Sequence, residues 1–276
     1  MSPLQFIADY NYIFAIIIPI ATGIIGFMGA KYNRYVKNKK IKSILKLTNN
    51  TVDIILPTRH GEVTPTNDDK TVIEAEFVAL NDLRAFYDTV GVIQDSGYEV
   101  SLVSDTDTLN NSNELKNIFC IGGPVANRKV ASYFRRYFTS VKFGMPPDKY
   151  INDYNREALV DFIYSESSVN VGTIAFGETE FKFKRGVRGG GCIILIRLVG
   201  EDTFGNREHG TVHICFGNTV ETNKHAAKCY TKYFSEFYRR VKKIRGNYFI
   251  VLKCTNDGII DFSSFKDYIA EVFRIE

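Results

Sequence analysis

The chain has 276 residues and a formal net charge of +4, and 45% of its residues are hydrophobic, among them 21 Phe and 16 Tyr. This apolar content is sufficient for a packed core and excludes a disordered chain. The charge is uneven, because residues 31–46 hold seven of the 35 Lys and Arg residues, while residues 47–276 hold 28 basic and 30 acidic residues. The larger part therefore lacks the basic surface of a general nucleic-acid-binding protein.

Five cysteines and four histidines are spread along the chain without metal-ligand spacing. The odd number and wide spacing of the cysteines also argue against a disulfide framework. Most of them lie in apolar, strand-like runs, so we expect buried free thiols in a reducing compartment. No metal site and no cofactor is predicted. These residues are Cys120, Cys192, Cys215, Cys229, Cys254, His60, His209, His213 and His225.

An uncharged, apolar stretch at residues 10–30 predicts a transmembrane helix, because about 20 residues span the hydrocarbon core of a bilayer. A secretory signal peptide would carry its positive charges before the apolar run, whereas here they follow it. Positive charges hold the end that carries them in the cytoplasm. We therefore expect a single-pass protein of the inner membrane, with residues 1–9 outside, a basic linker at 31–50 inside, and membrane lipids as partners.

Small residues recur every four positions in the predicted span, at Thr22, Gly26 and Ala30. Such a stripe lets another helix approach closely, which indicates a homo-oligomer. The alternative is the ordinary enrichment of glycine in membrane helices. A single span without charged residues cannot form a polar pore as a monomer.

Residues 51–276 are predicted to form a cytoplasmic α/β domain, because apolar β-branched runs alternate with amphipathic helices. Helices are expected where apolar residues recur at three- and four-residue spacing. This order of elements predicts a Rossmann-like, mostly parallel sheet. The elements expected in the first half are a strand at 52–56, a polar loop at 58–73, a helix at 74–90, strands at 98–103 and 117–121, and a helix at 128–138.

The middle of the domain changes character, because β-rich runs alternate with glycines and show no helical period. We expect antiparallel hairpins here, as a β-rich insertion at about residues 158–198 that ends in the apolar run 192–198. The elements expected after it are a strand at 211–216, a long helix with an apolar stripe from Ala227 to Ile244, a strand at 248–252 and a helix at 263–274.

Two segments share a layout in which a buried strand reaches a glycine turn and then a helix. Such turns offer free amides at the helix start and let a phosphate approach the backbone. In an open α/β sheet they lie at the carboxyl ends of the strands, where ligands bind. The alternative is ordinary turn chemistry. The residues are Gly122, Gly123 and Asn127 in the first segment, and Gly217, Asn218 and Thr219 in the second.

Other polar residues complete the predicted site for a nucleotide-like ligand. Arg128, at a helix start, opposes the helix dipole unless an anion lies nearby. Glu221 is a ribose-hydroxyl acceptor or a general acid/base, or only an acid that the dipole favours. The basic segment around Arg188 is a mobile flap or simply a hairpin tip. The first strand adds polar residues at its carboxyl end that either contact phosphate or are solvated, namely Thr58, Arg59 and His60.

The layout of membrane helix, basic collar and Rossmann-like domain resembles bacterial antiviral effectors, in which a nucleotide-sensing domain controls a toxic transmembrane segment. Residues 217–221 (Gly-Asn-Thr-Val-Glu) are similar to the glycine-threonine-glutamate turn of SLOG-type nucleotide sensors, although the first paired glycines are missing. Residues 122–123 are similar to the earlier glycine turn of these sensors. The resemblance implies a nucleotide second messenger as ligand.

We therefore predict a non-enzymatic membrane effector whose domain senses a nucleotide-like ligand or a partner defence protein. Binding would cluster the membrane helices and disrupt the membrane. The chain has no GxSxG, no P-loop and no complete GxGxxG motif. One alternative is a membrane-tethered enzyme, such as a glycosidase of NAD or a nucleoside with Glu221 as its acidic residue. Another is a scaffold that only recruits a cytoplasmic partner.

Overall fold

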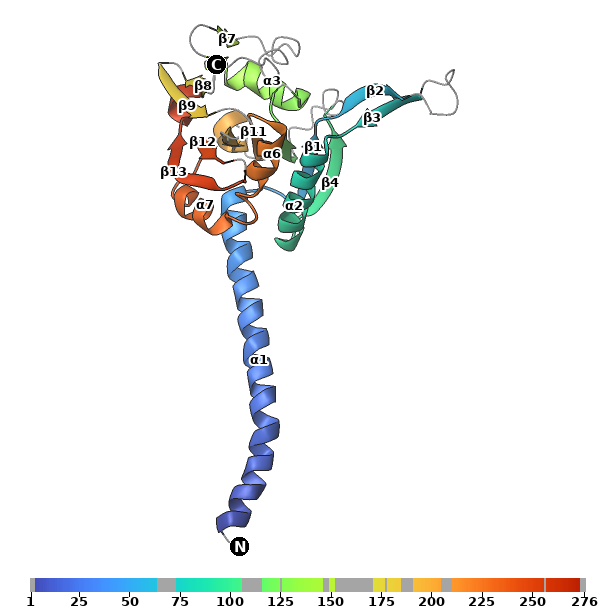
Figure 1. Cartoon of the computed structure of the whole chain (residues 1–276), viewed down its shortest axis with the longest axis vertical. Coiled ribbons are helices and arrows are strands. Elements are labelled where there is room, and N and C mark those ends of the chain that lie inside the picture. Colours follow the sequence, from blue (N-terminus) through green and yellow to red (C-terminus); the bar gives the residue numbers. More distant parts are fainter. Residues whose placement is uncertain are drawn as a thin grey trace.

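A long N-terminal helix joins a mixed α/β body at one end (Figure 1). Helix α1 (Pro3–Leu45) runs for 43 residues and contains Pro19. Residues 31–45, expected as a linker, continue this helix because they contain no glycine or proline and many good helix formers. The computed structural model describes residues 3–63, 73–105, 116–124, 126–145, 149–151, 171–176, 178–184, 191–204, 210–255 and 257–273.

The two ends of α1 have different surroundings. Its last turn enters the body, where Ile41, Ile44 and Leu45 are each 1% exposed. The predicted span at 10–30 includes residues 10–18, whose side chains lie outside the described ones. Within the described part of the chain, no helix carries an apolar stretch of the length that a bilayer crossing requires. Within residues 20–28 of α1, the large apolar side chains between 54% and 70% exposed are Ile20, Ile24, Ile25, Phe27 and Met28.

The body is built on a seven-stranded sheet with the strand order β13-β12-β10-β11-β5-β1-β4. Strands β4, β1, β5 and β11 pair in parallel, β10 and β13 run the opposite way, and β12 has the direction of β11. The prediction of an α/β chain with a mostly parallel sheet is confirmed. The strands are β1 (Thr51–Leu56), β4 (Glu99–Ser104), β5 (Asn117–Ile121), β10 (Gly191–Leu198), β11 (Val212–Gly217), β12 (Tyr248–Cys254) and β13 (Ile260–Asp267).

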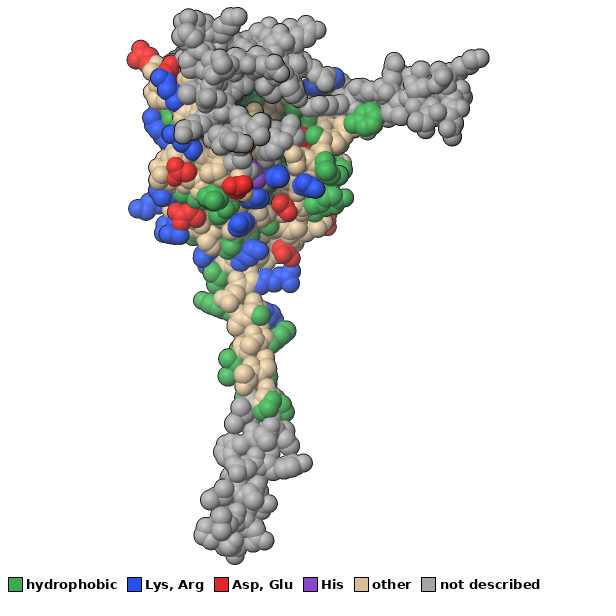
Figure 2. Space-filling view, viewed as in Figure 1, with side chains coloured by type: hydrophobic (Ala, Val, Ile, Leu, Met, Phe, Trp, Pro, Cys, Tyr) green, Lys and Arg blue, Asp and Glu red, His purple; other side chains and the backbone are tan. Residues whose placement is uncertain are grey.

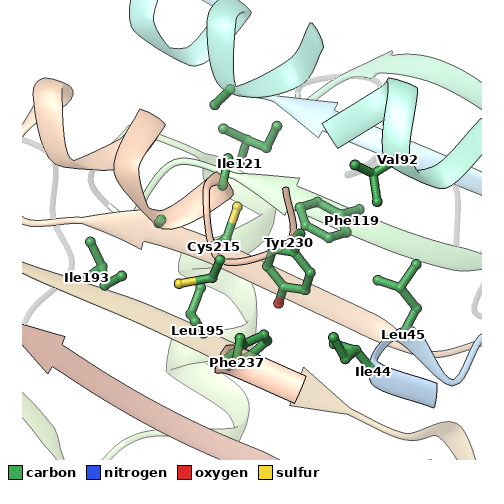
Figure 3. Packing of buried hydrophobic residues seen from close by; sticks show 14 of the residues in the cluster. Ile44, Leu45, Val92, Phe119, Ile121, Ile193, Leu195, Cys215, Tyr230 and Phe237 are labelled. Carbon is green, nitrogen blue, oxygen red and sulfur yellow. The ribbon is translucent and has the colours of Figure 1, made fainter. Parts of the chain in front are cut away.

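Each face of this sheet is covered by its own hydrophobic core. The last turn of α1 packs on one face together with α2 (Leu80–Asp95), α6 (Val220–Ala227) and α7 (Phe234–Val241). In this core Ile44 and Leu45 of α1 belong to the same cluster as Tyr230 and Phe237 (Figure 3). The other face is covered by α3 (Arg128–Tyr137), α8 (Ile269–Val272) and a smaller sheet.

The smaller sheet is antiparallel, with the order β7-β6-β8-β9, and a separate ribbon, β2-β3, projects from the body (Figure 1). Hairpin β8–β9 falls in the predicted insertion. The run 192–198 does not, because all eight residues of β10 are buried and need cover on both faces, so this strand lies inside the main sheet. Residues 152–170 lie outside the described ones. The remaining elements are β2 (Arg59–Val63), β3 (Ile73–Phe77), β6 (Val141–Met145), β7 (Lys149–Ile151), β8 (Val171–Phe176), β9 (Thr179–Lys184) and α5 (Gly200–Phe204).

Three predicted helices need correction. The first begins at Leu80 rather than 74, because apolar residues alternate with glutamates over Ile73–Phe77, which pairs with β2, so the expected loop at 58–73 also contains strand. The long helix is interrupted at 228–233, where amides bond three residues back, as Cys229 does to Ala226 (3.1 Å). The helix expected at 263–274 is found only at Ile269–Val272 (α8), because residues 263–267 belong to strand β13, which pairs along the edge of β12.

Candidate functional site

The structure brings the two glycine turns together at the carboxyl ends of adjacent parallel strands. Strand β5 pairs with β1 on one side and with β11 on the other. The Gly122 amide donates a hydrogen bond to the Cys215 carbonyl (3.1 Å), which joins the two strand ends. Because the chain passes from β1 to β4 on one side and to β5 on the other, this edge is also the switch point of the sheet, where ligands bind in open α/β folds.

A buried carboxylate, which the sequence analysis missed, occupies this switch point. Asp105 follows β4 directly and is 0% exposed. Its Oδ1 accepts hydrogen bonds from the Thr58 amide (2.9 Å) and the Thr58 hydroxyl (2.7 Å). Its Oδ2 accepts from the Arg128 amide at the start of α3 (2.8 Å). The negative charge that the helix start favours is therefore supplied by the protein itself.

Asn127 caps helix α3 and fixes it to the sheet. Its Oδ1 accepts hydrogen bonds from the amides of Lys129 and Val130, both 3.1 Å. Its side-chain amide donates to the carbonyls of Ile121 (2.9 Å) and Ile55 (3.3 Å). Asn127 thus has an N-cap role, and together with Asp105 it provides acceptors for the first three amides of α3. A phosphate at this helix start would have to displace one of them.

The glycines of the first turn are required by the backbone and by packing. Gly122 has a φ of +93°, a conformation that favours glycine. A Cβ on Gly123 would lie 2.8 Å from Cδ2 of the Phe216 ring, so this glycine makes room for the core residue of β11. The space beside the Gly123 backbone, where a ligand was predicted to approach, is occupied by the Phe216 ring in this structure.

The second glycine turn is also closed by internal hydrogen bonds. Asn218 extends the pairing of β11 with β10 through two hydrogen bonds to Cys192. Its side-chain Oδ1 accepts from the Cys192 backbone amide (2.8 Å), and its backbone amide donates to the Cys192 carbonyl (3.2 Å). The Gly217 amide donates to Asn223 Oδ1 (2.8 Å). Thr219 caps α6 in a reciprocal capping box with Thr222.

The other predicted site residues are not brought to these turns by any described contact. Arg59 and His60 lie in β2, at the base of the projecting ribbon, and their side chains are not among the described ones. Arg128 contributes its amide to Asp105, while its side chain is exposed. Arg188 and the side chain of Glu221 lie outside the described residues.

A second polar cluster, at the opposite edge of the sheet, joins helix α1 to the core. Arg197 of β10 is 0% exposed, and its guanidinium donates to the carbonyls of Ile44 (2.8 Å), Ile244 (2.8 Å) and Gly246 (2.6 and 3.1 Å). The guanidinium carbon also lies 4.5 Å from the centre of the Tyr248 ring. One side chain thus holds the end of α1 and the segment after α7 against the central strands.

His213 stands opposite Arg197 in the pairing of β11 with β10 and makes the next contact with α1. Its Nε2 donates to the Leu45 carbonyl (2.7 Å), which places the proton on this nitrogen. Burial, reinforced by the charge of Arg197, lowers the pKa of His213 to about 3, so the ring is neutral near pH 7. Thr211 completes the cluster by donating to the Lys46 carbonyl (2.7 Å).

The thiols of the chain belong to its packed cores. All five cysteines are buried, and burial raises the pKa of Cys120 to about 12, so its thiol is protonated at neutral pH. Among the residues that the structure describes, no group of His, Cys, Asp and Glu side chains is arranged to hold a metal ion. Comparisons with protein-family models, curated proteins and solved structures give no match for this chain.

Proposed function

We propose that the chain is a membrane-anchored effector of bacterial antiviral defence, in which a Rossmann-like cytoplasmic domain senses a trigger and clusters helix α1 to disrupt the inner membrane. The observation that carries the proposal is the junction at Arg197, which makes the end of α1 part of the domain core. The antiviral setting rests on the resemblance in layout, and the membrane and the clustering rest on α1 itself.

The middle of α1 supports an anchor because its described apolar side chains, at residues 20–28, have no protein cover. Ile25 and Phe27 are each 70% exposed, although residues of this kind are normally buried in soluble proteins. Lipid tails or neighbouring copies of the same helix would cover them. The basic residues begin directly after this segment, at Lys31 and Arg34, as expected on the cytoplasmic side of a membrane helix.

The small-residue stripe supports clustering. A Cβ added to Gly23, Gly26 or Gly29 would meet nothing within 4 Å among the described residues outside its own helix turn, so this surface is open to a neighbouring helix. Helices that approach through small residues pack closely in a bilayer. A trigger that brings domains together would therefore bring these stripes into contact.

The hydrogen bonds at the switch point favour a partner protein over a phosphate-bearing ligand as the trigger. The first amides of α3 already have acceptors in Asp105 and Asn127. A phosphate would meet the carboxylate of Asp105 and be repelled unless that side chain moved away. A nucleotide-like ligand thus requires rearrangement, whereas a protein could bind without it.

Forced clustering tests the function without knowledge of the trigger. An inducible dimerisation module fused to the C-terminus of the full chain should cause loss of membrane potential in expressing cells when the dimeriser is added. Gly26→Ile should prevent this loss by blocking close approach between helices, because the space beside Gly26 is open within its own chain. Ile25→Leu, beside the stripe and of equal volume, serves as the matched control and should behave like the wild type.

The outcome that contradicts the proposal is an unchanged potential after clustering of a protein that alkaline carbonate does not extract from membranes. Extraction by carbonate would instead contradict the anchor itself. If nucleotides but not cell extracts from infected cultures raise the melting temperature of the full chain, the trigger is a nucleotide rather than a partner protein.

A further inference from the structure

We propose that the side of the domain from which α1 emerges is a docking surface for anionic lipid headgroups, which deepens the proposed function and rests on it. This surface, the basic underside, consists of residues 31–46 at the end of α1 and residues 232–245 around α7. The two segments are about 200 residues apart in sequence but pack together, because α7 lies against α1 (Figure 1). Lys37 lies over the Phe234 ring and Lys40 over the Tyr238 ring, at 5.6 and 5.9 Å.

The positive charge of the chain is concentrated on this underside. Residues 31–46 hold seven basic residues and no acid, and residues 232–245 hold six basic residues and one acid, Glu236. Residues 1–30 contribute only Asp9, so the net charge of +4 leaves −7 for the rest of the chain. Lys and Arg side chains are prominent on the part of the body next to the helix (Figure 2). The underside thus differs in sign from the remainder of the domain.

Most of these cations are not neutralised within the chain. Glu236 pairs with Arg239 and Arg240, and Arg34 pairs with Asp95 (2.6 Å), so these three arginines are discounted. Among the described residues, the other cations of the underside have no carboxylate within 4.0 Å. The exposed members of this group are Lys31, Lys39, Lys42, Lys232, Lys242, Lys243 and Arg245.

Helix geometry places this surface close to the bilayer. Lys37 lies seven residues beyond the predicted span, or about 10 Å along the helix. The headgroup layer extends about 5 to 7 Å beyond the hydrocarbon on each side. Because Lys37 lies over the ring of Phe234, the first residue of α7, the start of α7 has the same depth as Lys37. It is therefore within about one Debye length, about 8 Å, of the headgroup surface at physiological salt. A tilt of about 20°, usual for membrane helices, toward α7 would bring its later lysines within the same range.

Anionic lipid fits this surface better than nucleic acid. The apolar part of α1 leaves from the same side, so the underside faces the membrane surface once the helix is inserted (Figure 1). A nucleic acid would have to enter between the domain and the bilayer. Basic residues beside a membrane helix gain affinity for anionic headgroups without needing a defined pocket.

A fluorescent label on Ser235→Cys, an exposed position on α7, can report docking in the full chain. The five native cysteines are buried, so the label attaches selectively. The labelled chain is placed in nanodiscs of phosphatidylcholine alone or with about 30% phosphatidylglycerol, and acrylamide quenching is measured. We expect protection from quenching only with phosphatidylglycerol, and loss of this protection at about 0.5 M NaCl.

Charge-neutral variants locate the effect. Each cation near an anionic surface contributes roughly fivefold, so Lys232→Gln, Lys242→Gln and Lys243→Gln together should lower the ratio of docked to free domain roughly 100-fold. The matched control replaces Lys182, Lys253 and Lys266 with Gln. These lysines are exposed and removed from the underside, two of them lying over the rings of Phe181 and Tyr268 on the other face of the sheet. The control should dock like the wild type.

Four outcomes would overturn the proposal. Equal quenching in both kinds of nanodisc, with the chain inserted, would remove the docking surface and leave the anchor standing. Protection in phosphatidylcholine discs only after addition of single-stranded RNA would assign the underside to nucleic acid. Equal loss of docking in the two triple variants would mean that net charge, rather than this surface, is responsible. Failure of the chain to enter any nanodisc would contradict the anchor and the docking together.

Discussion

Buried polar networks lie at both ends of the parallel strands of the seven-stranded sheet, at its carboxyl edge and at its amino edge, and they connect different parts of the chain. At the carboxyl edge, Asp105 and Asn127 provide acceptors for the start of α3 and close the turns where a ligand was expected. At the amino edge, Arg197 and His213 provide donors for the end of α1. The first network connects neighbouring parts of the sheet, whereas the second connects the body to a helix that extends far from it.

This difference shows where a structural change could be transmitted. Both networks are bound to the central strands, because β5 and β11 run side by side from one edge to the other. A partner that disturbs the Asp105 network would act on strands whose opposite ends carry the α1 junction. Substitutions that weaken each network in turn should lower the free energy of unfolding more at the amino edge than at the carboxyl edge.

Arg197→Met is expected to have the largest effect on stability. The substitution keeps most of the side-chain volume but leaves buried carbonyls of α1 and of the segment after α7 without their donor. Each unsatisfied buried acceptor costs about 1 to 3 kcal/mol, so we expect a loss of about 3 to 5 kcal/mol in the free energy of unfolding. Urea titration of the full chain in mild detergent measures it, with exposed Arg245→Met as the control at under about 0.5 kcal/mol. A loss below about 1 kcal/mol would show that the junction is not held by Arg197.

Asp105→Ala is expected to have an intermediate effect. It removes the acceptor for the Thr58 and Arg128 amides, at a cost of about 2 kcal/mol. Arg128→Ala is the matched control, because Asp105 uses the amide of Arg128 and not its exposed side chain, and it should change the free energy of unfolding by under about 0.5 kcal/mol. The same urea titration compares them. A larger loss for Arg128→Ala than for Asp105→Ala would mean that the arginine side chain, and not the carboxylate, stabilises the switch point.

The pH dependence of stability should report the burial of His213. Its pKa is about 3 in the folded chain and near 6.5 when unfolded, so the unfolded state takes up a proton first as pH falls. The contribution of the neutral His213 ring to the free energy of unfolding is fully present above pH 6.5. It is lost progressively toward pH 3, by about 2 kcal/mol between pH 6.5 and 5. His213→Gln keeps a donor for Leu45 but does not titrate, so its stability should fall less over this range. If the free energy of unfolding falls equally with pH in the two proteins, His213 is not buried as a neutral ring.

Local sequence patterns were sufficient for much of the sheet. The buried strands β1, β5, β11 and β12 are apolar, β-branched runs that end at turn residues, and this pattern is visible without knowledge of their partners. The glycine turns were also located, since Gly122 adopts a positive φ and Gly123 lies against the core. The internal hydrogen bonds of the amides at these turns disfavour the prediction that the turns bind phosphate.

The residues that sequence analysis missed act through long-range contacts. Arg197 and His213 read as ordinary strand positions, because their partners on α1 are more than 150 residues away. Asp105 did carry a signal, since it directly follows a parallel strand at the edge where ligands and caps gather. Residues 263–267 of β13 do not form the predicted helix because edge pairing with β12, rather than local propensity, determines their conformation.

The junction at Arg197 makes the end of α1 part of the domain core, so α1 and the body should move as one unit. Pulsed electron paramagnetic resonance in lipid nanodiscs tests this central claim. Spin labels at Tyr32→Cys on α1 and Ser101→Cys on β4 attach selectively, because both positions are exposed and the native cysteines are buried. Labels at Ser235→Cys and Ser101→Cys, both within the body, give a reference for the width of the distance distribution between two rigidly connected positions. We predict a single distance distribution for the α1 pair that is as narrow as the reference. A distribution several times broader, or one with several maxima, would show that α1 pivots at its junction and would contradict this claim.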